Sequence, residues 1–478
     1  MVFSSFIFVF GFLPIFLASY FLTPRRFKNL CILIWSYLFY AWGAPKIVLL
    51  LLLSSAADYL ISKRISQSSP GRKKACLSLG ILLNIGLLGY YKYANFFVAE
   101  FNRLLGYLET PPVTWAEIAL PIGISFFTFQ KISYLVDVYR QTALPAKNII
   151  NYLLYVVSFP QLIAGPIVRY HDVSQQIENR RHSPELLFSG AYRFCIGLGK
   201  KVLIADPMGN VASNVLKLDP SELTTSYAWL GIVCYAYQIY FDFSAYSDMA
   251  IGLGRMMGFR FLENFDRPYI SQNITEFWRR WHISLSRWMK DYLYIPLGGN
   301  RVSPKRLYFN LWIVFLLSGL WHGAAWTFVI WGAIHGLLLS FDKLFWLEFS
   351  NRLGRVTNTL LTFLLVCISW VFFRSDSLQI ALDYLARMFN PYEYWTLSDH
   401  VLRATVIHDH GIFILILASL ICFLPTSEKL SDFYSNIKDR LSEPQITLAR
   451  FAASAACILL SALAVATTDY APFIYFRF

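Results

Sequence analysis

Long apolar runs alternate with short polar segments along almost the whole chain. A helix of about 20 predominantly apolar residues crosses the hydrocarbon core of a bilayer, and runs near this length occur from one end of the sequence to the other. They cover residues 2–22, 30–61, 75–97, 118–138, 149–168, 186–205, 227–243, 311–335, 360–373, 412–423 and 451–464. The pattern predicts an all-α polytopic membrane protein with about eleven transmembrane helices.

Basic residues near the N-terminus predict how the first helices are oriented. Run 2–22 has no basic residue before it and is longer than the core of a signal peptide, so we expect a retained helix. Cytoplasmic loops are enriched in Lys and Arg, which places two basic segments in the cytoplasm. Their residues are Arg25, Arg26, Lys28, Lys63, Arg64, Arg72, Lys73 and Lys74. Run 30–61 is then a hairpin of two short helices that turns at residues 43–45, and the N-terminus is periplasmic.

Two of the runs contain helix-breaking residues. Pro160, Gly165 and Pro166 interrupt one, and Gly197 and Gly199 interrupt another. Lipid offers no hydrogen bonds, so irregular backbone at membrane depth has to be buried in protein or line a cavity. We therefore expect re-entrant segments besides the spans. Neither an internal repeat nor a long flexible linker divides the sequence, so we expect one membrane domain.

Composition excludes several classes of protein. Hydrophobic residues make up 56% of the chain and charged residues 15%, whereas soluble domains carry about 25% charged residues. A typical cytosolic enzyme, a disordered chain and a nucleic-acid-binding module are therefore excluded. The net charge of +13 is better explained by cytoplasmic loops that attract anionic lipid or an anionic substrate. The seven cysteines form no CxxC pair and are interpreted as small buried hydrophobes.

The segment from 242 to 306 is too polar to be a simple span and too aromatic to be a solvated loop. If residues 278–288 are helical, Trp278, Trp281, Leu285 and Trp288 share one face. The basic side chains of the same segment are suited to binding phosphate; they are Arg279, Arg280, Arg287 and Lys290. Two interpretations stay open: these residues hold the phosphates of a nucleotide-containing donor such as coenzyme A, or they anchor an interfacial helix to lipid head groups.

Three histidines lie in or beside apolar segments. His322 is well inside run 311–335, where an ionisable group is costly and therefore indicates function. It could act as a general base toward a hydroxyl, or it could be a structural histidine bonded to a neighbouring helix. His335 is 13 residues further along, which in one helix turns it to another face, so we expect it to be structural. His282 lies at the border of the tryptophan face.

Other polar residues carry weaker signals. Asp242, Ser244 and Asp248 lie at the end of a span, and the two acids either pair with nearby basic residues or take part in a proton relay. The remaining histidines, His171, His182, His400, His408 and His410, lie in polar loops and are expected at the solvated surface. An HxH pair alone is a weak metal signal, so no metal site is predicted. The sequence has no GxSxG, P-loop or HExxH motif, which leaves a soluble hydrolase, an ATPase and a zincin unsupported.

Several long motifs give the chain a recognisable resemblance. They are YYKYANFF (90–97), LPIGISFFTFQKISYLVDVYR (120–140), FPQLIAGPIVRY (159–170), YFDFSAYSDMAIGLG (240–254), NFDRPYISQNITEFWRRWHISLSRWMKDYLYIPLGGNR (264–301), GLWHGAAWTFVIWGAIHG (319–336) and the final PFIYFRF. With them the chain closely resembles the membrane-bound O-acyltransferase family, in the bacterial branch that includes the membrane subunit of alginate O-acetylation. The resemblance covers nearly the whole chain and weakens at residues 384–450.

The resemblance implies a fold and a site. The fold would be an irregular ring of helices with re-entrant and short cytoplasmic helices around a central tunnel, and the catalytic core would cover about 120–340. His322 would match the family's invariant histidine and His282 its second one. The acyl-donor site would comprise Trp278, Trp281, Arg279, Arg280, Arg287 and Lys290, supported by Asp242, Ser244 and Asp248. Acetyl-CoA would be a co-substrate, with no bound cofactor.

The expected function follows from this resemblance, and alternatives remain. The chain would pass acetyl from cytoplasmic acetyl-CoA, across the bacterial inner membrane, to a hydroxyl reached from the periplasm. The acceptor would be an exopolysaccharide such as alginate or, alternatively, peptidoglycan, reached directly or through a periplasmic SGNH-type acetyltransferase or relay protein. A proton-coupled transporter is the alternative of another class, because broken helices and intramembrane ionisable groups also occur in transporters.

Overall fold

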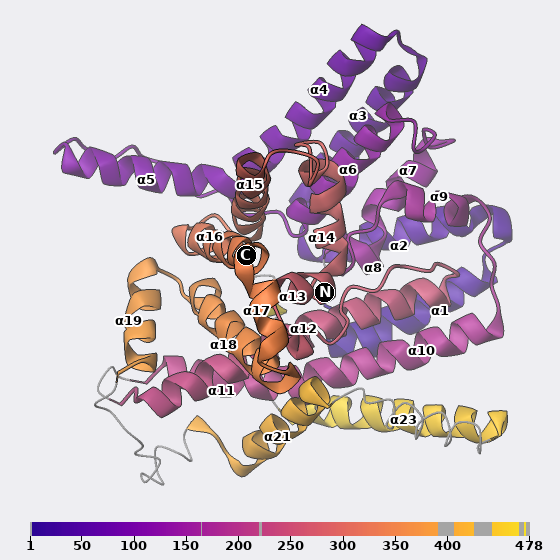
Figure 1. Cartoon of the computed structure of the whole chain (residues 1–478). Helices are drawn as coiled ribbons and strands as arrows, with labels where there is room; N and C mark the ends of the chain where they lie inside the picture. The colour runs from indigo at the N-terminus through magenta and orange to yellow at the C-terminus, as the bar shows by residue number, and fades with distance from the viewer. Residues whose placement is uncertain are drawn as a thin grey trace.

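The computed structural model describes residues 2–163, 165–218, 222–390, 406–424, 442–467 and 473–474. Every regular element in these ranges is a helix, and they contain no strand. The all-helical fold predicted from the apolar runs is confirmed for this part of the chain (Figure 1). Much of 384–450, where the resemblance weakens, His400 and most of the final motif lie outside the described residues.

The N-terminal third forms a series of helices, some with π-helical (η1, η4) or 3-10 (η2, η3) turns. They are η1 (Ile7–Phe12), α1 (Leu13–Leu22), η2 (Arg25–Phe27), α2 (Lys28–Gly43), η3 (Pro45–Ile47), α3 (Val48–Gln67), α4 (Pro70–Leu88), η4 (Gly89–Tyr93) and α5 (Ala94–Tyr107). The predicted break at residues 43–45 is confirmed, because α2 ends at Gly43 and α3 begins at Val48. The α5 helix projects from one side of the molecule (Figure 1).

The middle of the chain forms the centre of the molecule. Its elements are α6 (Ile124–Tyr139), α7 (Ile149–Val157), α8 (Phe159–Leu162), α9 (Tyr170–Glu178), α10 (Pro184–Gly199), η5 (Lys200–Ala205), α11 (Asp206–Leu216) and α12 (Thr225–Met256). The break expected near Pro160 is present, since α8 ends at Leu162. The break expected in run 186–205 is instead the π-helical segment η5, which continues α10 into α11.

The remaining elements follow α12 along the chain. They are η6 (Pro268–Ile270), α13 (Ile274–Arg280), α14 (Ile283–Met289), η7 (Lys290–Tyr294), α15 (Pro304–His322), α16 (Trp326–Phe341), η8 (Asp342–Trp346), α17 (Leu347–Phe349), η9 (Ser350–Arg352), α18 (Arg355–Arg374), α19 (Leu378–Met388), α21 (Asp409–Phe423) and α23 (Glu443–Thr467). The last of these, α23, packs along α10 at the edge of the molecule (Figure 1).

Within the described residues, five helical stretches are long and apolar enough to cross a membrane. They are Pro45–Gln67, Pro70–Tyr107, Trp326–Arg352, Arg355–Arg374 and Glu443–Thr467, with the shorter apolar helices Ile7–Leu22 and Asp409–Phe423 beside them. Among the other predicted spans, α6, α7 and α12 form helices that are mostly buried. The α6 helix, for example, buries Lys131 and Asp137 among protein neighbours. Such a helix is surrounded by protein, so it does not need the apolar surface that lipid requires.

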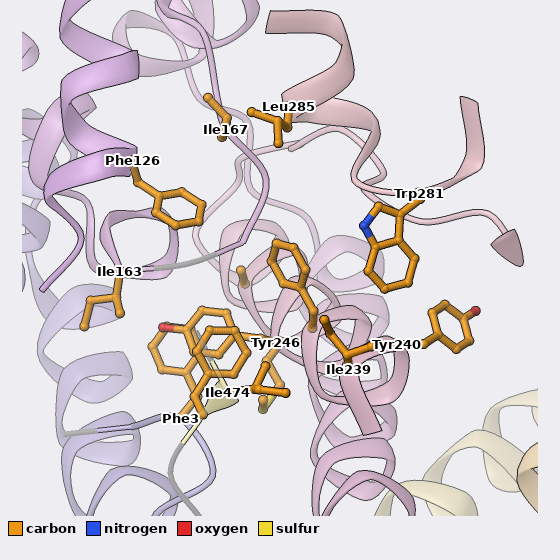
Figure 2. Packing of buried hydrophobic residues seen from close by; sticks show 14 of the residues in the cluster. Phe3, Phe126, Ile163, Ile167, Ile239, Tyr240, Tyr246, Trp281, Leu285 and Ile474 are labelled. Carbon is orange, nitrogen blue, oxygen red and sulfur yellow. The ribbon is translucent and has the colours of Figure 1, made fainter. Parts of the chain in front are cut away.

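Close helix packing places α12 at the core. A Cβ atom added to Gly190 of α10 would come within 2.6 Å of the backbone oxygen of Gly252 in α12, and one added to Gly197 within 2.7 Å of that of Ala245. Small residues at these contacts let the two backbones approach. Figure 2 shows the core that results, where Phe3 from the N-terminus, Tyr246 from α12 and Ile474 from the C-terminal end meet. Phe3 stacks on Tyr246 with ring centroids 4.5 Å apart.

The positions of the cysteines agree with their interpretation as small apolar residues inside the protein. Cys195, Cys234, Cys367 and Cys422 are buried, the other three are partly buried, and all are free thiols. They pack as small apolar side chains.

Candidate active site

His322 is the last residue of α15 and lies at a break between two helices. Gly323 follows it in an extended conformation, and α16 begins at Trp326. A Cβ atom on Gly323 would collide with the ring of Phe328, so a larger residue would fit here only if that ring moved. The prediction of one continuous helix over residues 311–335 is therefore wrong. The histidine lies at a buried helix end, where the chain can bend around it.

His335 lies on α16, a different helix from His322. Its Nδ1 accepts a hydrogen bond from Trp278 Nε1 at 3.2 Å, and its Nε2 lies 3.2 Å from Ser369 Oγ. The ring of Trp331 contacts both imidazoles, with centroids 5.1 Å from His322 and 4.9 Å from His335. His335 has the hydrogen-bonded surroundings of a structural residue.

His282 lies at a second helix break. The α13 helix ends at Arg280, α14 begins at Ile283, and His282 between them has a φ of 43°. The face predicted for Trp278, Trp281, Leu285 and Trp288 on a single helix is therefore wrong. The left-handed region is unusual for a non-glycine residue, and it turns the imidazole away from both helix axes into the core, where His282 is fully buried.

Asn264 holds His282 in this conformation. Its backbone oxygen accepts from Ile283 N at 2.9 Å, and its Oδ1 accepts from Ser284 Oγ at 2.8 Å. The same Oδ1 lies 3.1 Å from His282 Nδ1, while Asn264 Nδ2 donates to Ser247 Oγ. Because Oδ1 can only accept, Nδ1 carries the proton and donates to it, which leaves the lone pair on Nε2. Asn264 opens one of the long motifs, but no local pattern around it indicated a role at the site.

The fold brings His282 and His322 together. Their ring centroids are 6.5 Å apart, with an angle of 59° between the ring planes. The indole of Trp321 packs against both, at 6.0 Å from His282 and 4.9 Å from His322. Phe373 contacts the other side of His322 at 5.2 Å. Two imidazoles surrounded by aromatic rings and shielded from water can exchange protons with a small bound group.

Two cavities meet beside His322. One has a volume of about 290 Å³ and is lined by His322, Trp321 and residues at the start of α6. The other, of about 310 Å³, is lined by the turn that follows His322 and by Arg374 and Asp376 after α18. Lys92 and Leu120 line both cavities, so the two adjoin at this point. The imidazole therefore faces internal space rather than the lipid around the protein.

The acidic residues form ion pairs away from the histidines. Asp242 Oδ1 lies 2.9 Å from Lys201 Nζ, and Asp242 Oδ2 accepts from the backbone nitrogen of Ile474 at 2.7 Å. Asp248 pairs with Arg193 and Lys200, each at 2.7 Å. Ser244 Oγ is 3.5 Å from the oxygen of Phe241. These contacts are those of the structural alternative, in which the acids pair with nearby basic residues.

The basic and tryptophan residues expected to bind the acyl donor separate into two groups. Arg279, Arg287 and Lys290 are exposed. Arg280 pairs with Glu276 at 2.9 Å and Asp266 at 3.0 Å.

The tryptophans point the other way, into the protein. Trp278 donates to His335, and Trp281 lies buried against Trp370 with ring centroids 5.1 Å apart. Trp288 stacks on Phe129 at 3.7 Å and donates to its backbone oxygen. The indoles therefore anchor the two short helices, while three of the four basic residues face outward.

The four loop histidines among the described residues lie at the surface, and hydrogen bonds are made by His171 and His182. His171 Nδ1 lies 2.7 Å from Asp137 Oδ2, and this hydrogen bond raises the pKa of His171 above its usual value. His182 Nε2 lies 2.7 Å from the hydroxyl of Tyr20. His408 and His410 are exposed at the start of α21. Within the described ranges, no three His, Cys, Asp or Glu side chains are grouped closely enough to hold a metal ion.

Comparison with known proteins defines the class. The model of the membrane-bound O-acyltransferase family (MBOAT) matches residues 124–375, a stretch that contains His282, His322 and the helix breaks at which they lie. The chain belongs to this family of O-acyltransferases.

Individual relatives are similar over most or all of the chain. The probable alginate O-acetylase AlgI of Azotobacter vinelandii is 41% identical over 507 residues, covering 100% of both chains. The protein of the same name from Pseudomonas aeruginosa is 47% identical over 401 residues, 84% of this chain and 76% of the relative. The peptidoglycan O-acetyltransferase of Helicobacter pylori is 37% identical over 425 residues, 81% of this chain and 80% of the relative.

Proposed function

We propose that this protein is the inner-membrane acetyltransferase of an exopolysaccharide O-acetylation system, with alginate as the acceptor polymer. The relatives that match the whole chain carry the name alginate O-acetylase. The observation that carries the proposal is the meeting of His282 and His322 beside a cavity in the protein interior. Buried imidazoles beside internal space are suited to acid–base work on a hydroxyl.

The chemistry needs one base and one acid at that place. The oxygen of the acceptor hydroxyl attacks the thioester carbonyl carbon of acetyl-CoA, a C–O bond forms, and the C–S bond breaks. The hydroxyl proton passes to the His322 imidazole and from there to the departing thiolate, which leaves as the CoA thiol. His282 Nε2 accepts or returns a proton nearby, and the buried site protects the thioester from water. If a covalent acyl carrier lies between donor and acceptor, acetyl passes first from CoA to the carrier and then from the carrier to the acceptor hydroxyl. Each step breaks one bond to the acetyl group and forms another.

The donor is proposed to bind from the cytoplasmic side. Arg279, Arg287 and Lys290 are exposed near His282 in sequence, and their side chains are free to meet the phosphates of coenzyme A. Trp278 and Trp281 act through packing, because they hold the helices on which these basic residues lie. The Asp242 and Asp248 ion pairs, with Ser244 between them, support α12 behind the site.

The architecture proposed around the site is an irregular ring of about eleven spans enclosing a central tunnel. Its catalytic core covers about 120–340 of a single domain. The acetyl group leaves on the periplasmic side to an SGNH-type acetyltransferase or relay protein, or directly to the polymer. Peptidoglycan is the alternative acceptor, favoured by the similarity to the Helicobacter pylori enzyme. Because the chain belongs to an acyltransferase family, we do not propose the transporter alternative.

The test is acetyl transfer by the purified protein. Membranes or detergent-solubilised protein are incubated with radiolabelled acetyl-CoA, the periplasmic partner and either alginate or peptidoglycan fragments. The wild type is expected to label alginate and to release free CoA thiol. His322→Ala is expected to lower the rate by about 10²- to 10⁴-fold, the usual contribution of a general base, and His282→Ala by a smaller factor.

The control is His335→Gln, because His335 is buried beside the pair but has its own partners. It tests whether loss of any buried histidine stops transfer. Equal rates for His322→Ala and the wild type would contradict the role of His322. If only peptidoglycan is labelled, the acceptor is peptidoglycan rather than alginate, and the proposed chemistry is unchanged.

A further inference from the structure

The end of α15 is held by two side chains from a distant helix. The last carbonyl groups of an α-helix have no partner within the helix. In α15 the oxygen of Gly319 accepts from Gly323 N, which leaves the oxygens of Leu320, Trp321 and His322. Tyr93 Oη donates to the first of these. Lys92 Nζ donates to the second and, at 3.1 Å, to the third.

Lys92 and Tyr93 reach this point because of a π-helical turn. They are the last two residues of η4, which lies between α4 and α5. A π-helical turn holds one more residue than an α-helical turn and often marks a functional site. Neighbouring positions in an α-helix point about 100° apart, yet here two consecutive side chains bind consecutive carbonyls of one helix end.

The hydrogen bonds of Lys92 account for all of its donors. Besides the two carbonyls, Nζ donates to Ser125 Oγ at 3.1 Å, and an ammonium group has three N–H bonds. The group is buried, with 8% of the residue exposed. Its positive charge also lies at the negative end of the α15 dipole, where a cation is favourable. Lys92 is thus fully engaged with the protein and has no donor left for a substrate.

Lys92 also lies where the two cavities adjoin, since it lines both. The carbonyl groups that it binds belong to His322 itself and to Trp321, whose indole packs against both catalytic imidazoles. A shift of the α15 end would move the His322 ring relative to His282 and to both cavities. Misplacement by about 1 Å can lower a rate about a hundredfold.

We infer that Lys92 is a positioning residue for His322: with Tyr93 it fixes the last turn of α15, so that the imidazole is held at the junction of the two cavities. The inference rests on the proposed function, because it supposes that His322 acts in acetyl transfer. It assigns a role in catalysis to a charged side chain whose hydrogen bonds are made to the protein itself.

The test compares Lys92→Met, which keeps the length of the side chain and removes the charge, with Lys92→Arg, which keeps the charge. Initial rates are measured with labelled acetyl-CoA in full-length protein. We expect Lys92→Met to lower kcat by about ten- to a hundredfold and to leave the KM for acetyl-CoA within twofold. Lys92→Arg is expected to recover a substantial part of kcat. Tyr93→Phe, which removes one hydrogen bond from the same helix end, is expected to lower kcat by a few-fold.

A matched control is available in another buried lysine. Lys131 pairs with Asp58 at 3.1 Å, and both side chains are buried. The double variant Lys131→Met with Asp58→Asn removes a buried ammonium and its partner charge from α6 and α3 without touching α15. Thermal unfolding in detergent is recorded for every variant, so that activity is compared at equal folded fraction.

The outcomes separate the inference from the proposed function. A kcat for Lys92→Met within twofold of the wild type would overturn the inference. It would also be overturned if the control variant at Lys131 and Asp58 lost as much activity as Lys92→Met for the same loss of stability. If Lys92→Met does not fold, Tyr93→Phe and Ser125→Ala are measured instead. Wild-type kcat in both of these variants would overturn the inference. If His322→Ala is fully active, the proposed role of His322 fails, whatever Lys92→Met does.

Discussion

The helices α12 and α23 are both long, but they meet different surroundings. Of the 32 residues of α12, most are buried, and they include Asp242 and the aromatic residues of the core. In the 25 residues of α23 only Ser461 is buried, and the helix contains an apolar stretch long enough to cross a membrane. An apolar helix is stable in lipid because its side chains need no hydrogen-bond partners there. Protein accepts polar groups in a helix when it supplies their partners.

The comparison of α12 with α23 indicates which part of the molecule can carry catalytic side chains. Charged and polar side chains at the centre are satisfied by ion pairs and hydrogen bonds, so the fold can carry imidazoles there. The outer helices provide membrane contact and few specific interactions. Substitutions should therefore have large effects at the centre and small ones at the edge.

The largest effect is expected when the ion pair of α12 is broken. Asp242→Ala leaves Lys201 buried without one of its carboxylates and removes the acceptor for Ile474 N. Loss of one partner of a buried pair costs about 3–5 kcal/mol, which should appear as a markedly lower unfolding temperature in detergent. The double variant Asp242→Asn with Lys201→Met should lose less. An unchanged unfolding temperature for Asp242→Ala would show that α12 does not depend on this pair.

A smaller effect on the centre is expected from Asn264→Ala, which removes the acceptor that orients His282. Loss of a buried hydrogen-bond partner costs about 1–3 kcal/mol, and we expect kcat to fall by about ten- to a hundredfold while the fold is kept. Ser284→Ala is the comparison, because it removes one bond to Asn264 and leaves the Asn264–His282 contact. Equal rates in Asn264→Ala and Ser284→Ala would speak against an orienting role for Asn264.

The surface histidine His171 is expected to give a modest, pH-dependent effect. Its pKa is raised chiefly by the hydrogen bond to Asp137, so this interaction stabilises the folded state fully below the unfolded pKa of about 6.5. The stabilisation is lost as pH rises through the higher pKa of the folded state. Because His171 is partly exposed, it should amount to less than about 1 kcal/mol.

The measurement is the difference in unfolding temperature between the wild type and His171→Gln as a function of pH. The difference should favour the wild type at pH 6 and shrink toward pH 9. A difference that grows with pH would contradict the assigned interaction.

The smallest effect is expected at the edge. Leu459 in α23 is 63% exposed, and Leu459→Ala should change the free energy of unfolding by less than about 0.5 kcal/mol. Ile239 in α12 is 1% exposed, and Ile239→Ala should cost about 2–5 kcal/mol. Thermal unfolding of both variants measures the comparison directly. Similar losses at the two positions would remove the distinction between centre and edge.

Much of the helical framework could be predicted from local pattern. The apolar runs predicted helices, and the break at Gly43–Pro45 followed from residues that cannot continue a helix. His322 and His282 could be singled out because an ionisable group is costly in an apolar segment and because the motifs around them resemble a known family.

The two breaks that build the site could not be predicted in the same way. Around His282 the spacing of tryptophans fits a continuous helix, and the helix ends there because Asn264, distant in sequence, binds Ile283 and Ser284. Around His322 the run is apolar throughout, and the turn forms where Gly323 meets the ring of Phe328. Lys92 is an ionisable residue inside run 75–97, but its partners on α6 and α15 could not be predicted from local pattern.

The sequence by itself determined that this chain is an all-helical membrane protein and which of its side chains are too costly to bury without purpose, because apolarity and charge are properties of each residue and its neighbours along the chain. Only the tertiary structure decided which of those side chains face one another. The distance between His282 and His322, the carbonyl groups at Lys92 and the partner of Asp242 all depend on contacts between segments far apart in sequence, and no local pattern specifies which of the possible partners packing will bring within reach.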